Sequence, residues 1–121
     1  MEDLTKAEEK VMKVLWHLKK AFVHDIIAQL PDPKPPYNTI SSVVRVLTKK
    51  GFTGFKAYGK TYEYYPQISQ NEYRLFSFKK LLSGYFDGSY EKLVSFMVDK
   101  EEISEEELNK IRELIESKKA E

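Results

Sequence analysis

The sequence predicts a mainly α-helical chain with one small β-hairpin, divided into two domains near Pro66. Three observations predict this class. Apolar residues recur at helical spacing along most of the chain, one short segment between them has a strand-like pattern, and three capping boxes mark helix starts. A chain of 121 residues can hold one small domain and a helical extension, but it is too short for two large cores.

A first helix is predicted over residues 5–19, because Thr5-Lys6-Ala7-Glu8 has the pattern of a capping box. An apolar stripe at helical spacing belongs to it, made of Leu4, Val11, Val14, Leu15 and Leu18. A second, shorter helix over residues 23–30 is expected to turn Ile26, Ile27 and Leu30 inward. It must end before Pro31, since proline cannot continue a helix.

The third predicted helix has two contrasting faces. Its apolar face consists of Ile40, Val43, Val44 and Leu47, and its opposite face consists of Asn38, Ser41, Ser42, Arg45 and Lys49. A solvated helix face usually mixes glutamate with lysine, whereas this polar face contains no acid. The pattern therefore predicts a helix that faces a polyanion.

A β-hairpin is predicted directly after the third helix, which Gly51 is expected to end. Two short strands cover residues 52–55 and 61–65 and are joined through Tyr58-Gly59-Lys60. Three helices followed by a hairpin with cations at its tip is the order of a winged helix-turn-helix domain, predicted here for residues 1–67. In this fold the third helix enters the major groove and the hairpin contacts the neighbouring backbone or minor groove.

The charge distribution also favours nucleic acid as the partner of the first domain. Residues 1–66 contain 11 Lys/Arg and 7 Asp/Glu, while residues 67–121 contain 9 and 12. Between Pro33 and Tyr62 there are six cations and no carboxylate. Such a segment suits the phosphates of double-stranded DNA.

The residues expected to contact DNA lie on the third helix and the wing: Tyr37, Asn38, Thr39, Ser41, Ser42, Arg45, Lys49, Lys50, Lys56, Tyr58 and Lys60. Arg45 has two parallel donors that fit a guanine, and a phosphate contact suits it nearly as well. The lysines are expected to neutralise phosphates, although any of them can equally be a solvated surface lysine. Tyr37 and Tyr58 either donate to phosphates or simply pack.

Residues 68–121 are predicted to form a helical dimerisation domain. Ser69 and Glu72 make a second capping box, Gly84 and Gly88 bracket a break before a helix over residues 89–99, and Ser104-Glu105-Glu106-Glu107 is a third capping box. Three short helices cannot bury so many apolar side chains among themselves, so a second copy of the chain is expected to cover them. The residues assigned to this homodimer interface are Tyr73, Phe76, Leu81, Tyr85, Leu93, Val94, Met97, Leu108, Ile111, Leu114 and Ile115.

Several classes of function are disfavoured by the residues present. The chain has no cysteine, which excludes disulfides, thiolate zinc sites and a cysteine nucleophile. His17 and His24 fall on different predicted helices without clustered carboxylates, so no metal, cofactor or catalytic residue is expected. No apolar run approaches the length of a membrane span, and a soluble cytoplasmic protein is expected. The alternative to DNA binding is a winged-helix protein-interaction module, which would present an apolar or mixed-charge third helix.

From about Leu4 to Lys119 the chain resembles the penicillinase repressor family of the BlaI/MecI type. The similarity is carried by Leu4-Thr5-Lys6-Ala7-Glu8, Val11-Met12, Leu15-Trp16, Asn38-Thr39-Ile40, Leu47-Thr48-Lys49-Lys50-Gly51-Phe52, Tyr62-Glu63-Tyr64-Tyr65-Pro66, Leu93-Val94-Ser95-Phe96 and Lys100-Glu101-Glu102-Ile103-Ser104. The order and spacing of these segments together make the resemblance specific.

The resemblance implies a homodimeric transcriptional repressor whose two heads bind the halves of a palindromic operator. In relatives that control β-lactam resistance, a membrane-bound sensor protease cuts the dimerisation region, usually at an Asn-Phe bond. The aligned bond here is Ser95-Phe96, which lacks that Asn. Copper-responsive relatives carry Cys-x-Cys motifs, which a chain without cysteine cannot supply.

Two departures from the family lie near the third helix. Pro35-Pro36-Tyr37 stands where relatives often have a Trp, and Val46 stands where they have a basic residue, with Arg45 one position earlier. One position on a helix is a rotation of about 100°. The operator is therefore expected to differ in detail from those of relatives.

Overall fold

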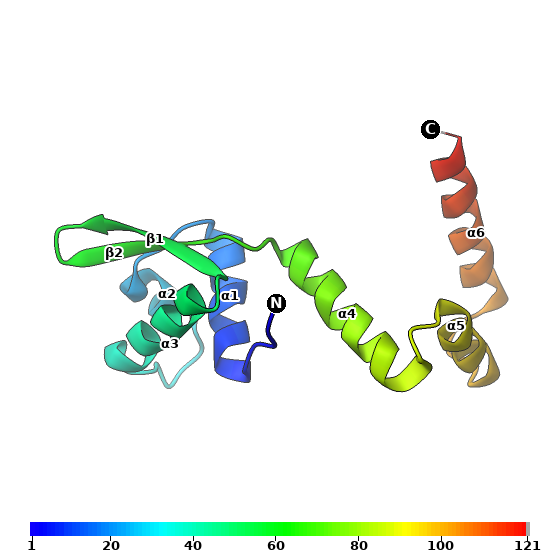
Figure 1. The fold of residues 1–121 in the computed structure, drawn as a ribbon, viewed down its shortest axis with the longest axis horizontal. Helices are drawn as coiled ribbons and strands as arrows, with labels where there is room; N and C mark the ends of the chain where they lie inside the picture. The colour runs from blue at the N-terminus through cyan, green and yellow to red at the C-terminus, as the bar shows by residue number, and fades with distance from the viewer. Residues whose placement is uncertain (121) are drawn as a thin grey trace. The chain divides into compact units, whose positions relative to one another are not determined.

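The computed structural model describes residues 1–120 and contains six helices and one two-stranded antiparallel sheet (Figure 1). In chain order the elements are α1 (Lys6–Leu18), α2 (Val23–Gln29), α3 (Tyr37–Lys49), β1 (Thr53–Tyr58), β2 (Thr61–Pro66), α4 (Gln70–Phe86), α5 (Tyr90–Asp99) and α6 (Glu105–Lys119). The predicted class, mainly helical with a small β-wing, is confirmed. The chain divides into two compact units between Ser77 and Phe78, inside α4, whereas the sequence predicted a division after Gln67.

The first unit, residues 1–77, is called the head here. Helices α1, α2 and α3 pack around one apolar core, to which the strands contribute Tyr64 and the loop after α3 contributes Phe52. The capping box predicted at the start of α1 is present, since the Thr5 side chain accepts from the Glu8 N–H while Glu8 accepts from the Thr5 N–H. The core is formed by Val11, Met12, Leu15, Trp16, Ala21, Val23, Ile26, Leu30, Ile40, Val44, Leu47, Phe52 and Tyr64.

The wing is the hairpin of β1 and β2, paired from Thr53 with Pro66 to Tyr58 with Thr61. It is longer than predicted, because β1 continues past Phe55 to Tyr58 and leaves a two-residue turn of Gly59 and Lys60. Tyr64 also exchanges two backbone hydrogen bonds of 2.8 and 2.9 Å with Ala21. This bridge fixes the base of the wing to the segment between α1 and α2.

The first turns of α4 belong to the head. The Trp16 indole N–H donates to the Ile68 carbonyl at 2.9 Å, and the Tyr73 ring lies 5.9 Å from that of Trp16 and 5.7 Å from that of Phe52. The Leu4 N–H donates to the Tyr73 hydroxyl at 3.3 Å. Tyr73, which the sequence assigned to the dimer interface, therefore packs inside the head against Trp16 and Phe52.

The break between α4 and α5 lies later than predicted. Helix α4 runs through Gly84 to Phe86, and the chain turns at Asp87 and Gly88, whose φ angles are 52° and 73°. Ser89 then caps α5 by accepting from the Lys92 N–H. A glycine with an ordinary φ angle is tolerated inside a helix at a modest cost, so Gly84 does not end α4.

The second unit contains the end of α4 together with α5 and α6. Aromatic contacts join α4 to α5, with ring centroids 6.0 Å apart for Phe78 and Tyr90 and 5.5 Å apart for Phe86 and Phe96. Leu82 is buried, whereas neither α5 nor α6 contains a buried residue. The predicted capping box of Ser104 and Glu107 is present at the start of α6.

Candidate nucleic-acid interface

A stripe of polar side chains runs along the exposed side of α3. Asn38, Ser42, Arg45 and Lys49, called the polar stripe here, follow one another at spacings of four, three and four residues. This spacing aligns them on one side of a helix, and all four are exposed. Ile40, Val44 and Leu47 are buried on the opposite side. The apolar side anchors α3 in the core and directs the polar stripe to solvent.

Three of the predicted DNA-contacting cations are unpaired among residues 1–120. Arg45, Lys49 and Lys60 are exposed and make no ion pair or hydrogen bond through their side chains in this part of the chain. Burial raises the pKa of Tyr64, and the Arg45 guanidinium partly opposes this rise, as expected for a positive charge near the base of the wing. These cations remain available to an anionic partner.

Two other cations of the acid-free segment are used inside the head. The Lys50 ammonium donates to the Glu8 carboxylate at 2.7 Å, and the two side chains are only 21% and 7% exposed. The Lys34 ammonium donates to the carbonyls of Ala28 and Leu30 at the end of α2. Lys50 was predicted to contact phosphate, and in the structure its ammonium is paired inside the head.

The Glu8–Lys50 pair also stabilises the ionised form of Glu8. Burial disfavours the carboxylate, but hydrogen bonds from Lys50 and from the Thr5 backbone outweigh it, so the pKa of Glu8 is lowered. The pair joins the first turn of α1 to the last residue before Gly51. It therefore holds the end of α3 in place.

The wing presents a cation at its tip and another on β1. Gly59 has a φ of 63°, which suits glycine in the tight turn beside Lys60, and the Thr61 hydroxyl donates to the Tyr58 carbonyl at 2.9 Å. Lys56 is exposed and its ammonium lies 5.2 Å from the centroid of the Tyr58 ring. A side-chain hydrogen bond thus stabilises the turn, and Lys56 and Lys60 are open to solvent.

The two predicted tyrosines pack against the head and are still partly open to solvent. Tyr37 is 44% exposed and its ring lies 4.9 Å from the His24 ring. Tyr58 is 47% exposed and its ring lies 5.8 Å from the Phe22 ring. Both hydroxyls can still donate hydrogen bonds to a partner.

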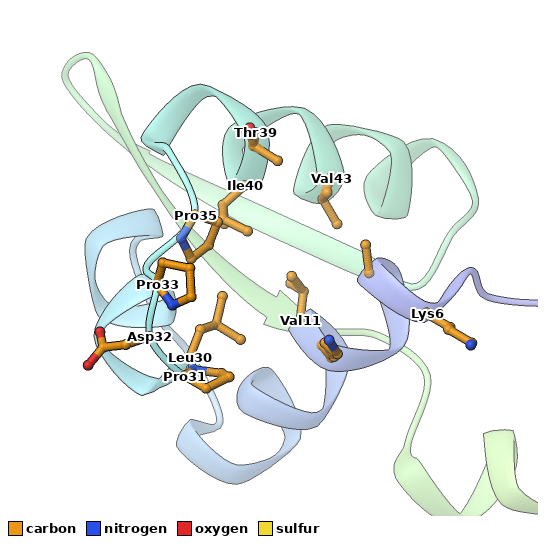
Figure 2. A pocket seen from close by; sticks show the side chains of 12 residues that line it. Lys6, Val11, Leu30, Pro31, Asp32, Pro33, Pro35, Thr39, Ile40 and Val43 are labelled. Atoms are coloured by element: carbon orange, nitrogen blue, oxygen red, sulfur yellow. The ribbon is translucent and has the colours of Figure 1, made fainter.

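Thr39 is exposed on one flank of the polar stripe. It borders an apolar groove of about 530 Å³ between α1, the proline-rich loop and α3, shown in Figure 2. Ile40 and Val43 line this groove from α3, and Val11 lines it from α1 (Figure 2). Ser41 is half-buried on the opposite flank of the stripe. Among the predicted residues of α3, the four residues of the polar stripe therefore form the exposed centre.

Val46 is an exposed residue of α3 that the predicted site left out. Its side chain is 41% exposed, although valine is an apolar residue. It precedes Lys49 by three residues and follows Ser42 by four, so it lies beside the polar stripe. Helix α3 turns Ile40, Val44 and Leu47 toward the core and leaves Val46 open to solvent.

The residues predicted for dimerisation differ in their exposure. Six are exposed in the described chain, while Leu93, Met97 and Leu108 are half-buried. The exposed fractions of the six are 47% for Leu81, 80% for Tyr85, 40% for Val94, 47% for Ile111, 62% for Leu114 and 50% for Ile115. Phe76 is half-buried beside Tyr73 in the head. The candidate dimerisation surface therefore lies on residues 78–120.

Within residues 1–120, no cluster of three or more His, Asp or Glu side chains could hold a metal ion. In the same range, no helix combines the length and the apolar character of a membrane span.

Comparisons with known proteins place the chain in a family. Residues 4–117 match the family model for the penicillinase repressor. The methicillin resistance regulatory protein MecI of Staphylococcus aureus strain N315 is 27% identical over 117 residues, which cover 96% of this chain and 95% of MecI. The penicillinase repressor of Bacillus licheniformis is 26% identical over 121 residues, which cover 96% and 91% of the two chains.

The solved structure of the CopR repressor is 29% identical with a TM-score of 0.46, and the match covers 56% of this chain and 100% of that one. The family model carries the assignment, because its match runs from Leu4, just before α1, to residue 117 in the last turn of α6. The chain belongs to the penicillinase repressor family.

Proposed function

We propose that this protein is a homodimeric transcriptional repressor that binds a palindromic DNA operator. The observation that carries the proposal is the polar stripe of Asn38, Ser42, Arg45 and Lys49, which is exposed and free of acid. A helix with such a face, followed by a wing with a cation at its tip, matches the way winged helix-turn-helix domains dock on DNA. The family assignment and the names of the relatives support the same function.

The residues of the interface divide into two roles. Arg45 can bind the O6 and N7 atoms of a guanine through two parallel donors, and Asn38 can bind the N6 and N7 atoms of an adenine. Lys49, Lys56 and Lys60 neutralise phosphates and set the register of the head on the duplex. Tyr37, Ser41, Ser42 and Tyr58 supply neutral hydrogen bonds, and Thr39 reaches the backbone from the flank.

Binding to the promoter of the protein's own operon tests the proposal. Affinity for this duplex, measured by fluorescence anisotropy at two salt concentrations, should fall steeply as salt rises, because bound phosphates release counterions. Binding should also survive an excess of nonspecific DNA. The proposal fails if no operator-like duplex is retained at low salt.

Arg45→Ala tests the reading contact. The exposed guanidinium makes no ion pair in the described chain, so its removal should leave thermal unfolding unchanged. Specific binding should weaken by about 1 to 3 kcal/mol, with relaxed preference at one base pair. Arg74→Ala is a matched control, because Arg74 is an exposed arginine on α4 that pairs only locally with Asn71.

The dimer is proposed from the second unit. Its exposed apolar side chains, among them Tyr85, Ile111 and Leu114, exceed what a monomer normally leaves open to solvent in so short a segment. A twofold copy of the same surface would bury them. Two heads in one dimer would share a single binding event on the two half-sites, which explains how one small head suffices.

Inactivation by a membrane-bound sensor protease is proposed at Ser95-Phe96. Both residues are exposed, but they lie inside α5, so a protease would need this short helix to open locally. Helix α5 contains no buried residue, which keeps the cost of opening low. Incubation with the cognate protease followed by mass spectrometry tests the site, and an intact Ser95-Phe96 bond would exclude this mode of release.

A further inference from the structure

We propose that Val46 recognises the methyl group of a thymine in the major groove of the operator. The inference rests on the proposed function, since it requires α3 to lie in that groove. It adds a base preference that the polar residues of α3 do not supply.

Val46 differs in chemistry from the other exposed residues of α3 between Asn38 and Lys49. From Asn38 to Lys49, the exposed residues of α3 are Asn38, Thr39, Ser42, Arg45, Val46 and Lys49. Five of these are polar or charged, and Val46 is the apolar one. Its side chain is not part of the core, to which α3 contributes Ile40, Val44 and Leu47.

The position of Val46 brings it to the same partner as the polar stripe. Residues three and four apart are neighbours on a helix surface, so Val46 lies next to both Ser42 and Lys49. Arg45 is the adjacent residue in the chain. A duplex contacted by these three side chains must also approach Val46.

The chemistry of valine selects the feature that it can recognise. The side chain has no hydrogen-bond donor or acceptor, so it makes no hydrogen bond to a phosphate, a sugar or a polar base edge. The 5-methyl of thymine is the apolar group that DNA displays in the major groove. Valine is also stiff about χ1, so little conformational entropy is lost when it packs against that methyl.

The test uses an operator selected from a random duplex pool with the full-length protein. Each thymine of the selected site is then replaced singly by deoxyuridine, which removes the methyl and leaves the base-pairing groups unchanged. The native protein should lose about fourfold in affinity at one thymine of each half-site, the effect expected for one methyl removed from contact.

The Val46→Ala variant should bind the thymine operator with about the affinity that the native protein has for the deoxyuridine operator. It should also be insensitive to deoxyuridine at that position. Lys49→Gln is the control, since it should weaken binding to every duplex while keeping the full response to the methyl. Thermal unfolding of Val46→Ala should match that of the native protein, because the side chain packs outside the core.

The possible results of these measurements distinguish the role of Val46 from the proposed repressor function. Tight, salt-sensitive binding with no response to any deoxyuridine would overturn the role of Val46 and leave the repressor proposal intact. A response that persists in Val46→Ala would assign the methyl to another residue and also overturn it. If no operator is selected, the repressor proposal fails and the inference falls with it.

Discussion

Lys49 and Lys50 are neighbours in the sequence, yet the fold gives their ammonium groups different surroundings. Lys49 is exposed at the end of the polar stripe, whereas Lys50 is 21% exposed and bound to Glu8. A helix turns about 100° per residue, which is enough to move a side chain from solvent to the contact between α1 and α3. Composition alone treats the two lysines as equivalent.

Substitution of each lysine by glutamine should separate DNA binding from stability. Lys49→Gln should weaken DNA binding and reduce the slope of log affinity against log salt by about 0.9, with unchanged thermal unfolding. Lys50→Gln should lower the free energy of unfolding by about 1.5 to 3 kcal/mol, the usual effect of losing a hydrogen bond to a charged group. Its salt slope should stay that of the native protein. Equal effects of the two variants on both measurements would contradict these separate roles.

Glu8 should make the stability of the head depend on pH. Its pKa in the folded protein lies below the usual 4.5, so the folded state favours the ionised form. This contribution is fully present above the unfolded pKa and is lost as pH falls through the folded pKa. Urea unfolding of the native protein should therefore show a decline in free energy below about pH 5.

Glu8→Gln removes this titration. Its deficit in stability relative to the native protein should be largest at neutral pH and should shrink as the solution is acidified through the folded pKa of Glu8. Glu9→Gln is the matched control, because the Glu9–Lys13 pair is 3.4 Å long with side chains 42% and 63% exposed, and such pairs contribute little. A deficit of Glu8→Gln that is constant with pH would refute the assignment.

At the scale of the element, α4 serves two units of the chain. Its first turns complete the core of the head through Tyr73, and its later residues Leu82 and Phe86 pack in the second unit. The capping box at Ser69 is visible in the sequence, but the burial of Tyr73 depends on where Trp16 and Phe52 are placed. The division predicted after Gln67 assigns these first turns of α4 to the second domain, whereas their side chains pack in the head.

Tyr73→Phe and Tyr85→Phe should differ in their effect, although both remove one hydroxyl from α4. The Tyr73 hydroxyl accepts from the Leu4 N–H, so its loss should cost about 1 kcal/mol of stability in the head. Tyr85 is 80% exposed, and its substitution should leave head unfolding unchanged. Trp16 fluorescence reports on the head, since its indole is bonded to the Ile68 carbonyl. Equal unfolding midpoints for the two variants would argue against a structural role of Tyr73.

At the scale of the whole molecule, the second unit leaves apolar surface that its own helices do not cover. Helix α6 contains no buried residue, and its side chains of Ile111, Leu114 and Ile115 are about half or more exposed. The hydrophobic effect therefore favours association through this unit. In the proposed dimer, the two heads would act together on one proposed operator.

Leu114→Glu should convert the dimer to a monomer at micromolar concentration, measured by light scattering. A carboxylate placed at the centre of an apolar interface must be desolvated, which opposes association. Asn109→Glu changes the charge equally on the polar side of α6 and should remain dimeric. Operator affinity should fall with Leu114→Glu because the heads no longer bind as one unit. A native protein that is monomeric under these conditions would contradict the proposed dimer.

Much of the fold is predictable from the residues in their order. The capping boxes at Thr5, Ser69 and Ser104 mark the starts of α1, α4 and α6, because each depends on contacts within four residues. The apolar period of α3 likewise predicts which side of that helix is buried. The sequence predicted a break bracketed by Gly84 and Gly88, but α4 continues through Gly84 and the chain turns at Gly88, where φ is positive. Glycine favours a helix end without requiring one, so its presence alone does not locate the break.

The sequence by itself determined the helical class, the order of the elements, the acid-free polar face of α3 and the family. The tertiary structure decided which cations face solvent, that Tyr73 packs in the head, and how far the side chain of Val46 is exposed. The physical reason is the range of the interactions. Capping and helical periodicity act between residues close in the chain, whereas pairing of Lys50 with Glu8 and burial of Tyr73 depend on segments that only folding brings together.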